Sequence, residues 1–433
     1  LSELQERLPG IPEIAPSELA SLRTLRDVAN KLQPGGVSVP PETEAKVAEV
    51  VEGAPAAVVK PSIVPVAEPT PVSAFVPRIV EALRPGFGLS GLTDGVTVQV
   101  TNESPSLADE LVQGLIERGV SAQVVEAPTV TASAVICLAG LSDHESGPQG
   151  ALAIHTSAIQ AARLVAQHPE PSERLFVTVQ ATGGDFGLTG DPGQAAWSGG
   201  LTGVVKTAAR EWPGAALKAI DVADPATAAV EILDEIFLGG PTPEVGIAAD
   251  GTRSVVEIEP LAKDGERNAV LKPGSVVVVS GGARGVTASS VAKLAEAWNI
   301  RLALMGRSKL AEWPEGIPLS TDTVQLTGAL VSVAKDRGEK VDFGGIQKQA
   351  QSLAASAEVR MSLAELDARG IEAVYLSADV TDAEQVGSAL QHVREKWGPI
   401  AGIVHGAGVL RDKALAEITP DRVADVFGPK VTG

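Results

Sequence analysis

The fold of this chain is indicated by one stretch, Val276-Val277-Val278-Val279-Ser280-Gly281-Gly282-Ala283-Arg284-Gly285-Val286-Thr287. An apolar run stops at glycines, and a helical pattern comes next, carried at i, i+3, i+4 and i+7 by Val291, Leu294, Ala295 and Trp298. Strand, glycine turn and helix in this order are typical of a dinucleotide-binding fold, because the glycines and the helix N-terminus can receive a pyrophosphate. The strand is apolar throughout, which predicts a parallel sheet covered by helices on both faces.

The spacing of the glycine turn is G-x-x-x-G from Gly281 to Gly285, with Gly282 inside it. It differs from the standard G-x-G-x-x-G fingerprint. A glycine-rich turn in any α/β protein could have this form, so the interpretation depends on the residues at the later strand ends.

Length and composition exclude several classes of protein and indicate the number of domains. A chain of 433 residues predicts two or three domains. The formal net charge of −19 argues against a nucleic-acid partner, so an anionic cofactor must be held by backbone amides and a few Arg or Lys. No apolar run is long enough for a membrane helix, and no spacing suggests a metal site. The single cysteine, Cys137, is typical of a buried thiol in a cytoplasmic protein.

The sequence pattern of residues 1–80 does not predict a domain that folds independently. Residues 1–32 read as short helices with too few apolar residues for a core of their own. The opening, Leu1 to Leu8, resembles the second half of a helix, so we expect a fragment of a longer polypeptide. Residues 33–80 are rich in Pro, Ala, Val and Glu, which predicts an extended, disordered linker.

Residues 81–270 alternate strands and helices, which predicts an α/β unit. The expected strands are 96–100, 121–125, 134–138, 175–179, 217–221, 244–248 and 253–258, and the expected helices are 107–119, 152–166, 201–211 and 227–237. The turn after the first strand, 101–105, has no glycine cluster. This unit is therefore expected to resemble a dinucleotide fold without the means to bind a dinucleotide.

Residues 271–433 form a second α/β pattern. Its expected strands are 276–279, 301–305, 373–376 and 400–405, and its expected helices are 288–298, 363–369 and 383–397. A long insertion, 310–359, interrupts it, and Ile346, Ala350 and Leu353 predict one separate helix there.

Residues suited to a cofactor come after the next two strands. After the second strand, Arg307 and Ser308 favour the 2′-phosphate of NADPH, whereas an acidic residue would favour NAD. The alternative is that Arg307 is a solvent-facing residue of a loop. After the third strand, Asp379 and Val380 could meet the adenine, although Asp-x-Thr is also a common helix cap.

The fourth strand ends in His405-Gly406-Ala407-Gly408-Val409. The glycines would let the backbone pass close under a cofactor. We expect His405 to be a core histidine whose hydrogen bonds are satisfied, with no role as a base. Four such landmarks at four successive strand ends are far more specific than any one of them, because ligands of parallel sheets bind at that edge.

These motifs resemble, in order, those of a ketoreductase domain of the short-chain dehydrogenase/reductase superfamily, in its polyketide and fatty acid synthase branch. Thr287 replaces the last glycine of the usual loop. Residues 96–260 resemble the degenerate structural half of such reductases, with Glu211-Trp212-Pro213 and Ile220-Asp221 as matching positions. Residues 1–32 resemble the end of an acyl carrier domain, cut after its phosphopantetheine serine. This order is similar to polyunsaturated fatty acid synthases of the iterative polyketide type.

The resemblance implies a fold and a site. The fold is α/β, with two Rossmann-like units, the second truncated, preceded by a helical remnant and a Pro/Ala-rich linker. Phe427 to Gly433 matches the motif Phe-x-x-Lys-Val-x-Gly, so Lys430 would be the catalytic lysine, although without the motif it would count as a surface lysine. The implied cofactor-binding residues are Ser280, Gly281, Gly282, Ala283, Arg284, Gly285, Val286, Arg307, Ser308, Asp379, Val380, Gly406, Ala407 and Gly408.

The implied reaction is hydride transfer from NADPH to the β-keto carbon of a thioester on a phosphopantetheine-bearing carrier domain. The partners would be carrier domains and other synthase domains. The catalytic serine and tyrosine are expected beyond Gly433, and Tyr375 is expected in the core, so this chain alone would be inactive. A non-catalytic scaffold, or pseudo-reductase, remains the alternative. A free-standing NADP-dependent reductase or epimerase fits the fold but not the carrier-like start or the linker.

Overall fold

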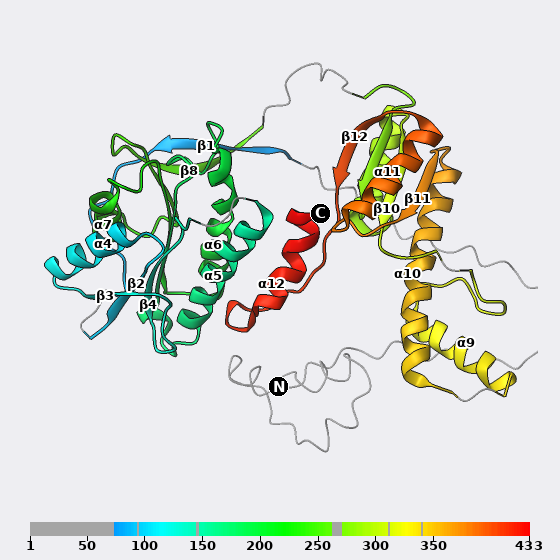
Figure 1. The fold of residues 1–433 in the computed structure, drawn as a ribbon, viewed down its shortest axis with the longest axis horizontal. Helices are drawn as coiled ribbons and strands as arrows, with labels where there is room; N and C mark the ends of the chain where they lie inside the picture. The colour runs from blue at the N-terminus through cyan, green and yellow to red at the C-terminus, as the bar shows by residue number, and fades with distance from the viewer. Residues whose placement is uncertain (1–72, 93–94, 144–146, 262–270, 311, 339–340) are drawn as a thin grey trace, which may run out of the picture. The chain divides into compact units, whose positions relative to one another are not determined.

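The computed structural model describes residues 73–92, 95–143, 147–261, 271–310, 312–338 and 341–433 (Figure 1). The chain divides into two compact units, Leu1–Pro71 and Val72–Gly433, and the described residues belong to the second. The predicted carrier remnant, 1–32, and most of the predicted linker lie outside the described residues.

The first half of this unit is built on an eight-stranded sheet in the order β1-β8-β7-β6-β5-β4-β2-β3. Strands β2 to β7 run parallel to their neighbours, and β8 and β1 add antiparallel at one edge. The strands are β1 (Phe75–Glu81), β2 (Thr97–Thr101), β3 (Ser121–Val125), β4 (Ala134–Gly140), β5 (Leu175–Gln180), β6 (Ala216–Val222), β7 (Glu244–Ile247) and β8 (Arg253–Pro260).

Helices cover both faces of this sheet, as the apolar parallel strands require. On one face, α4 (Pro105–Glu117) and α7 (Ala229–Leu238) pack on β2, β4, β5 and β6 in one apolar core. On the other, α5 (Pro148–Ala166) and α6 (Leu201–Glu211) form a second core. Cys137 lies in that core, and burial raises the pKa of its thiol to about 12, which confirms the buried cysteine.

The linker prediction is wrong at its end, because residues 75–81 form the edge strand β1, paired antiparallel with β8. The prolines of this region indicated a linker. Pro77 lacks a backbone N–H, which an edge strand tolerates because one side of it makes no ladder bonds. Its partner strand, β8, is distant in sequence, so no local sequence pattern predicts β1.

A buried ionic cluster joins β6, α7 and β8 and was not expected from the sequence. Lys218 and Glu235 are fully buried, and Arg253 is 6% exposed. Glu235 Oε1 lies 2.5 Å from Lys218 Nζ, and Glu235 Oε2 lies 2.7 Å from Arg253 Nε. Both cations also donate hydrogen bonds to the carbonyl of Gly239, the C-cap residue of α7.

The second half is built on a four-stranded parallel sheet in the order β11-β10-β9-β12. Its strands are β9 (Val276–Ser280), β10 (Arg301–Gly306), β11 (Ala373–Ser377) and β12 (Ile400–His405). In chain order this is 3-2-1-4, the arrangement found at the start of a dinucleotide-binding sheet. Helices α8 (Gly285–Trp298) and α10 (Phe343–Ala368) cover one face and α11 (Ala383–Trp397) the other.

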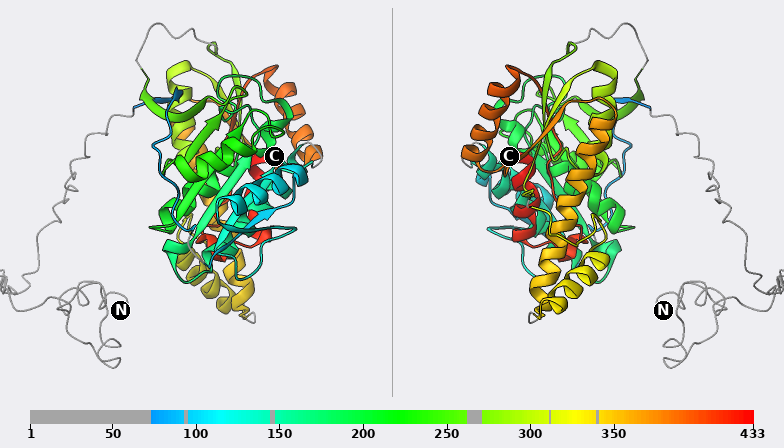
Figure 2. Two further views of the ribbon diagram at one scale, coloured as in Figure 1. Left: turned by 90° about the vertical axis from the view of Figure 1, so that its left-hand side faces the viewer. Right: turned by 90° about the vertical axis from the view of Figure 1, so that its right-hand side faces the viewer.

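The predicted break between the insertion helix and residues 363–369 is wrong, because α10 is continuous. From Ile346 to Ala368 the sequence contains neither Gly nor Pro, so nothing ends the helix. Helix α9 (Thr323–Asp336) lies beside the N-terminal half of α10 (Figures 1 and 2). The two share a separate apolar cluster of Ile317, Leu326, Leu330, Ala350, Leu353 and Ala354.

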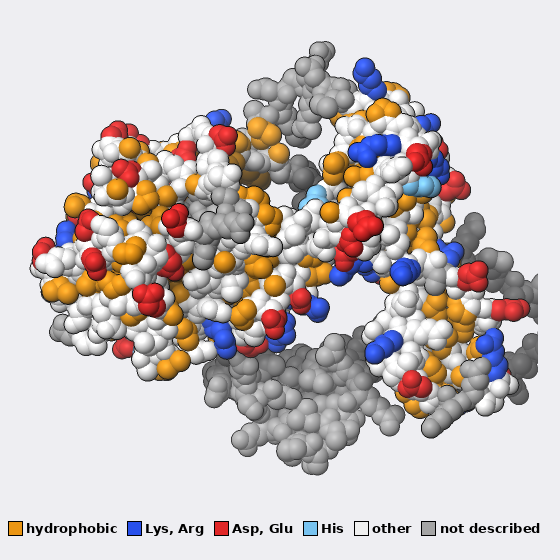
Figure 3. Space-filling view, in the orientation of Figure 1, with side chains coloured by type: hydrophobic (Ala, Val, Ile, Leu, Met, Phe, Trp, Pro, Cys, Tyr) orange, Lys and Arg blue, Asp and Glu red, His pale blue; other side chains and the backbone are white. Residues whose placement is uncertain are grey.

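The described part of the chain contains neither a membrane-spanning helix nor a cluster of metal-binding side chains. None of its helices has the length and apolar character needed to cross a bilayer. Its His, Cys, Asp and Glu side chains nowhere gather in threes suited to a metal ion. On the face shown in Figure 3, Lys and Arg side chains are interspersed with Asp and Glu, and no continuous basic field is visible.

Candidate functional site

The turn between β9 and α8 requires glycine. Gly281 has φ +66°, and a Cβ there would lie 2.7 Å from the carbonyl oxygen of Gly406. At Gly282 a Cβ would lie 2.4 Å from Val279 Cγ1. Gly285, with φ +58°, begins α8 earlier than the predicted Ala288. The backbone at Gly281 and Gly282 therefore carries no side chain, and the turn leads directly into a helix N-terminus.

The ends of all four strands meet at one edge of the sheet. Ser280 pairs in register with both Met305 and His405, and Gly306 pairs with Ser377. The turns after these strands surround a hollow of about 90 Å³. It is lined by Gly281, Arg284, Met305, Gly306, Arg307, Ala378, Asp379, Val380, Ala407, Gly408, Val409 and Pro429. Half of the predicted cofactor-binding residues thus lie around one space, with at least one from each turn.

The remaining predicted residues lie elsewhere. Ser280 and Ala283 are buried, at 6% and 5% exposure, and Gly282 and Gly406 are packed closely against their neighbours. Gly285 and Val286 line a different cavity, and the side chain of Val286 is 84% exposed. Ser308 does not line the hollow, and its carbonyl oxygen accepts a 2.8 Å hydrogen bond from the Tyr375 hydroxyl.

The second and third turns bring a cation and an anion to the hollow. Arg307 is exposed at the end of β10. The Asp379 carboxylate accepts hydrogen bonds from the backbone N–H and hydroxyl of Thr381, at 3.0 and 2.8 Å. These bonds, aided by the positive charge of Arg307, hold the pKa of Asp379 below its usual range. Asp379 is therefore a fixed anion beside an exposed cation.

Tyr375 packs against the apolar core that β9 and β10 form with α8 and α10, as predicted, although it is only partly buried. β11 is the edge strand of this sheet, and one side of it has no neighbour there. Burial raises the pKa of Tyr375, and its hydroxyl anchors the segment after β10 by the bond to Ser308.

His405 is exposed, which corrects its prediction as a core histidine, although its hydrogen bonds are satisfied as expected. Nδ1 lies 2.8 Å from Ser280 Oγ, and Nε2 lies 2.9 Å from the carbonyl oxygen of Pro429. β12 is the other edge strand, so its last side chain is not covered. The sequence around His405 could not predict these hydrogen-bond partners, because Ser280 and Pro429 are distant from it in sequence.

Lys430 lies in a single π-helical turn, Gly428–Thr432, and its side chain is exposed. Its Cε lies 2.9 Å from the position that a Cβ on Gly408 would occupy. The aliphatic part of Lys430 therefore rests against the glycine turn after β12, beside the hollow.

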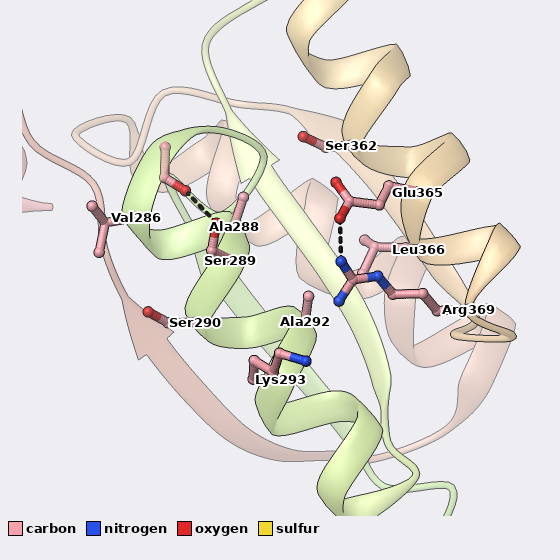
Figure 4. Close-up of a pocket in the computed structure, with 11 residues that line it drawn as sticks. Val286, Ala288, Ser289, Ser290, Ala292, Lys293, Ser362, Glu365, Leu366 and Arg369 are labelled. Atoms are coloured by element: carbon pink, nitrogen blue, oxygen red, sulfur yellow. Dashed lines mark hydrogen bonds and ion pairs between the residues drawn. The ribbon is translucent and has the colours of Figure 1, made fainter. Parts of the chain in front are cut away.

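A larger cavity, about 940 Å³, runs between α8 and α10 (Figure 4). Figure 4 shows Ala288, Ser289 and Ala292 on α8 across from Glu365, Leu366 and Arg369 on α10. The charged side chains at this cavity form salt bridges with one another or with a neighbour. Arg369 pairs with Glu296 and Glu365, and Lys293 also pairs with Glu296. This cavity lies between two helices on one face of the sheet, whereas ligands of open parallel sheets bind at the carboxyl ends of the strands.

The glycine turn supplies a direct test of this site. We expect Gly281→Ala to lower the free energy of unfolding by about 1–3 kcal/mol, because a left-handed backbone and a clash with Gly406 oppose the new Cβ. Gly387→Ala is the matched control: it lies inside α11 with open space around it and should gain up to about 1 kcal/mol. Urea unfolding measures both. Equal stabilities for the two variants would contradict the assigned turn geometry.

Comparison with known proteins identifies the region. Residues 275–433 match the family model described as KR domain. A polyunsaturated fatty acid synthase polypeptide of Thraustochytrium sp. is 32% identical over 278 residues, which is 60% of this chain and 10% of that protein. A reducing polyketide synthase of Cochliobolus heterostrophus is 45% identical over 74 residues, which is 17% of this chain and 3% of that protein. The chain thus spans a tenth or less of the length of these curated relatives.

Solved structures show the same fold. A ketoreductase domain from the bacillaene assembly line matches with a TM-score of 0.54 at 15% identity, covering 83% of this chain and 69% of that one. The first ketoreductase of the tylosin polyketide synthase matches with a TM-score of 0.53 at 18% identity, covering 82% and 68%. These likenesses confirm the predicted α/β class with Rossmann-like sheets. Residues 275–433 match the KR domain family, and the chain is similar to the ketoreductase-containing region of polyketide and polyunsaturated fatty acid synthases.

Proposed function

We propose that this chain forms the cofactor-binding part of an NADPH-dependent reductase, which converts a carrier-bound β-ketoacyl thioester into the β-hydroxyacyl thioester. The observation that carries the proposal is the convergence of four glycine- and charge-bearing turns on one hollow at the carboxyl edge of the parallel sheet. The match of residues 275–433 to the KR domain family supports the same reaction class.

The residues at the hollow fit a dinucleotide phosphate. The close approach of Gly281 to Gly406 leaves a bare backbone cradle, and the N-terminus of α8 adjoins it. The Gly281–Gly285 turn would hold the pyrophosphate through backbone N–H groups. Arg307 and Ser308 would hold the 2′-phosphate, and Asp379 and Val380 the adenine. The glycines after β12 would allow close approach of the reacting end of the cofactor, and NADPH when bound supplies the hydride.

Lys430 is the catalytic residue that we assign in this chain. Its ammonium group beside the fourth turn would lower the pKa of a tyrosine hydroxyl that donates a proton to the carbonyl oxygen of the substrate, while a serine orients that carbonyl. The only tyrosine here, Tyr375, lies in β11 with its hydroxyl bonded to Ser308. The tyrosine of the reaction would therefore come from residues other than these 433.

The proposal extends to partners. The substrate would arrive on the phosphopantetheine arm of an acyl carrier domain, and other synthase domains of the same polypeptide would make and consume it. The similarity to segments of multidomain synthases supports this context. We place the synthase in the cytoplasm, in keeping with the single buried, unreactive thiol of Cys137.

A non-catalytic scaffold is the second candidate. The eight-stranded half favours it, because that half keeps a parallel Rossmann-like sheet although no glycine cluster comes after β2. A fold of this kind can persist without a site. The two candidates differ in one property, the binding of NADPH by the four-stranded half.

Titration of the purified 433-residue chain with NADPH, monitored by nicotinamide fluorescence, tests the proposal. We expect saturable binding together with no detectable reduction of a β-ketoacyl thioester, because the chain lacks an available tyrosine donor. Gly387→Ala, in α11, should bind NADPH as the unmodified chain does. Absence of binding would favour the scaffold, and measurable reduction would overturn the assignment of the missing tyrosine.

A further inference from the structure

The end of β12 carries a hydrogen-bonded side chain that no part of the proposed reaction uses. His405 is the last residue of β12 and lies in register with Ser280, the last residue of β9. One ring nitrogen contacts Ser280 and the other the carbonyl of Pro429, which directly precedes Lys430. We propose that His405 is a positioning residue that fixes the backbone of Lys430 relative to the first and fourth turns. The catalytic role of Lys430 rests on the proposed function.

When the ring of His405 is neutral, its partners allow one arrangement of protons. A carbonyl oxygen only accepts, so Nε2 must carry the hydrogen that is donated to Pro429. In the neutral ring Nδ1 then accepts, and the Ser280 hydroxyl donates to it over 2.8 Å. Ser280 Oγ in turn accepts from the backbone N–H of Ala407 over 3.2 Å. In the neutral ring, the bond to the carbonyl of Pro429 therefore selects the Nε2–H tautomer.

These bonds join three segments that are distant in sequence. Ser280 precedes the glycine turn after β9, Ala407 lies in the turn after β12, and Pro429 lies in the π-helical turn that carries Lys430. The side chains of His405 and Lys430 are both exposed, so neither is held by burial. The hydrogen bond from His405 ties the carbonyl of residue 429, and with it the point from which the lysine side chain starts, to the end of β12.

The assignment also explains why Ser280 is buried at a turn that faces a cofactor. Its side chain is 6% exposed, and both its bonds run within the protein. Ser280 therefore acts on the site through His405 and Ala407 rather than by direct contact with a cofactor. A π-helical turn at Lys430 fits the same interpretation, since such turns occur frequently at functional sites and need support from their surroundings.

The first test compares three variants of the 433-residue chain. His405→Leu removes both bonds, His405→Gln can still donate to Pro429, and His392→Leu is the matched control on the exposed surface of α11. We expect amide hydrogen exchange in 428–433 to accelerate about tenfold in His405→Leu, the loss expected for one hydrogen bond. His405→Gln should restore much of the protection, and His392→Leu should leave it unchanged.

The second test reads the tautomer directly. Long-range ¹⁵N–¹H correlation spectra of the histidine-labelled chain should show one ring, absent in His405→Leu, in the neutral Nε2–H form. An Nδ1–H tautomer would overturn the proposal, and so would equal exchange in His405→Leu and His392→Leu. Neither measurement needs NADPH. A chain that fails to bind NADPH would refute the proposed function while these two results stand or fall separately.

Discussion

Arg307→Asp is expected to raise the Kd for NADPH about 100-fold while changing the Kd for NADH less than about threefold. A charge-assisted hydrogen bond contributes about 1.5–3 kcal/mol, and each 1.4 kcal/mol is about tenfold in affinity. The variant also sets a carboxylate beside the 2′-phosphate, close to Asp379, which already carries a negative charge. NADH lacks that phosphate, so its binding avoids both effects. Fluorescence titrations of the two cofactors measure the ratio.

The control for Arg307→Asp is Arg210→Asp, the same charge change on the exposed surface of α6. It should leave the affinity for both cofactors unchanged. The result also depends on Arg284, the other arginine that lines the hollow, which pairs with Glu358 on α10 at 3.2 Å. Because that guanidinium already has an anionic partner, we expect Arg307 to dominate the preference. Equal losses of NADPH and NADH affinity would refute the 2′-phosphate role of Arg307.

Glu235→Gln should lower the free energy of unfolding by about 3–5 kcal/mol, because it leaves the buried cations Lys218 and Arg253 without a counter-charge. Glu259→Gln is the matched control. It removes the anion of an exposed pair with Arg78, and such pairs contribute at most about 1 kcal/mol. Urea unfolding monitored by circular dichroism measures both. Similar costs for the two variants would show that the buried cluster does not stabilise the eight-stranded half.

The same cluster predicts how stability depends on pH. Burial opposes ionisation of Glu235, yet hydrogen bonds from Arg253 and the charge of Lys218 leave the pKa of Glu235 below its usual value. Its contribution is therefore present above the ordinary glutamate pKa and is lost as pH falls through the lower, folded-state pKa. Burial lowers the pKa of Lys218, so the folded chain binds that proton less tightly than the unfolded chain, and stability rises with pH between the lowered and the ordinary lysine pKa. In Glu235→Gln the acid-side loss should be smaller than in the unmodified chain.

Much of the fold was predictable because its signals are local. The apolar run of β9 ends at glycines, and the strand extends one residue beyond the predicted 276–279, to Ser280. Helix α11 begins after Asp382, whose carboxylate accepts hydrogen bonds from Glu384 N and Gln385 N, and it ends before Gly398. Caps of this kind need no distant partner, so the boundaries of α11 agree with those expected.

The meeting of the four turns was also predictable, because the carboxyl ends of parallel strands share one edge of a sheet. Which residues reach the hollow was not. Val286 belongs to the same motif as Gly281, yet the start of α8 turns it outward, where it is 84% exposed. Short motifs specify the backbone of a turn, whereas the direction of each side chain depends on the helix that comes after it.

Periodicity, glycine spacing and helix caps thus determined the strands of both sheets except β1, most of the helices, and the edge at which a cofactor would lie. Tertiary contacts decided the pairing of β1 with β8, the hydrogen bonds of His405 to Ser280 and Pro429, and the burial of Glu235 between two cations. The physical reason is the distance along the sequence over which each kind of interaction acts. Backbone preferences act within a few residues, while pairing, charge compensation and side-chain hydrogen bonds join groups that only the folded chain brings together.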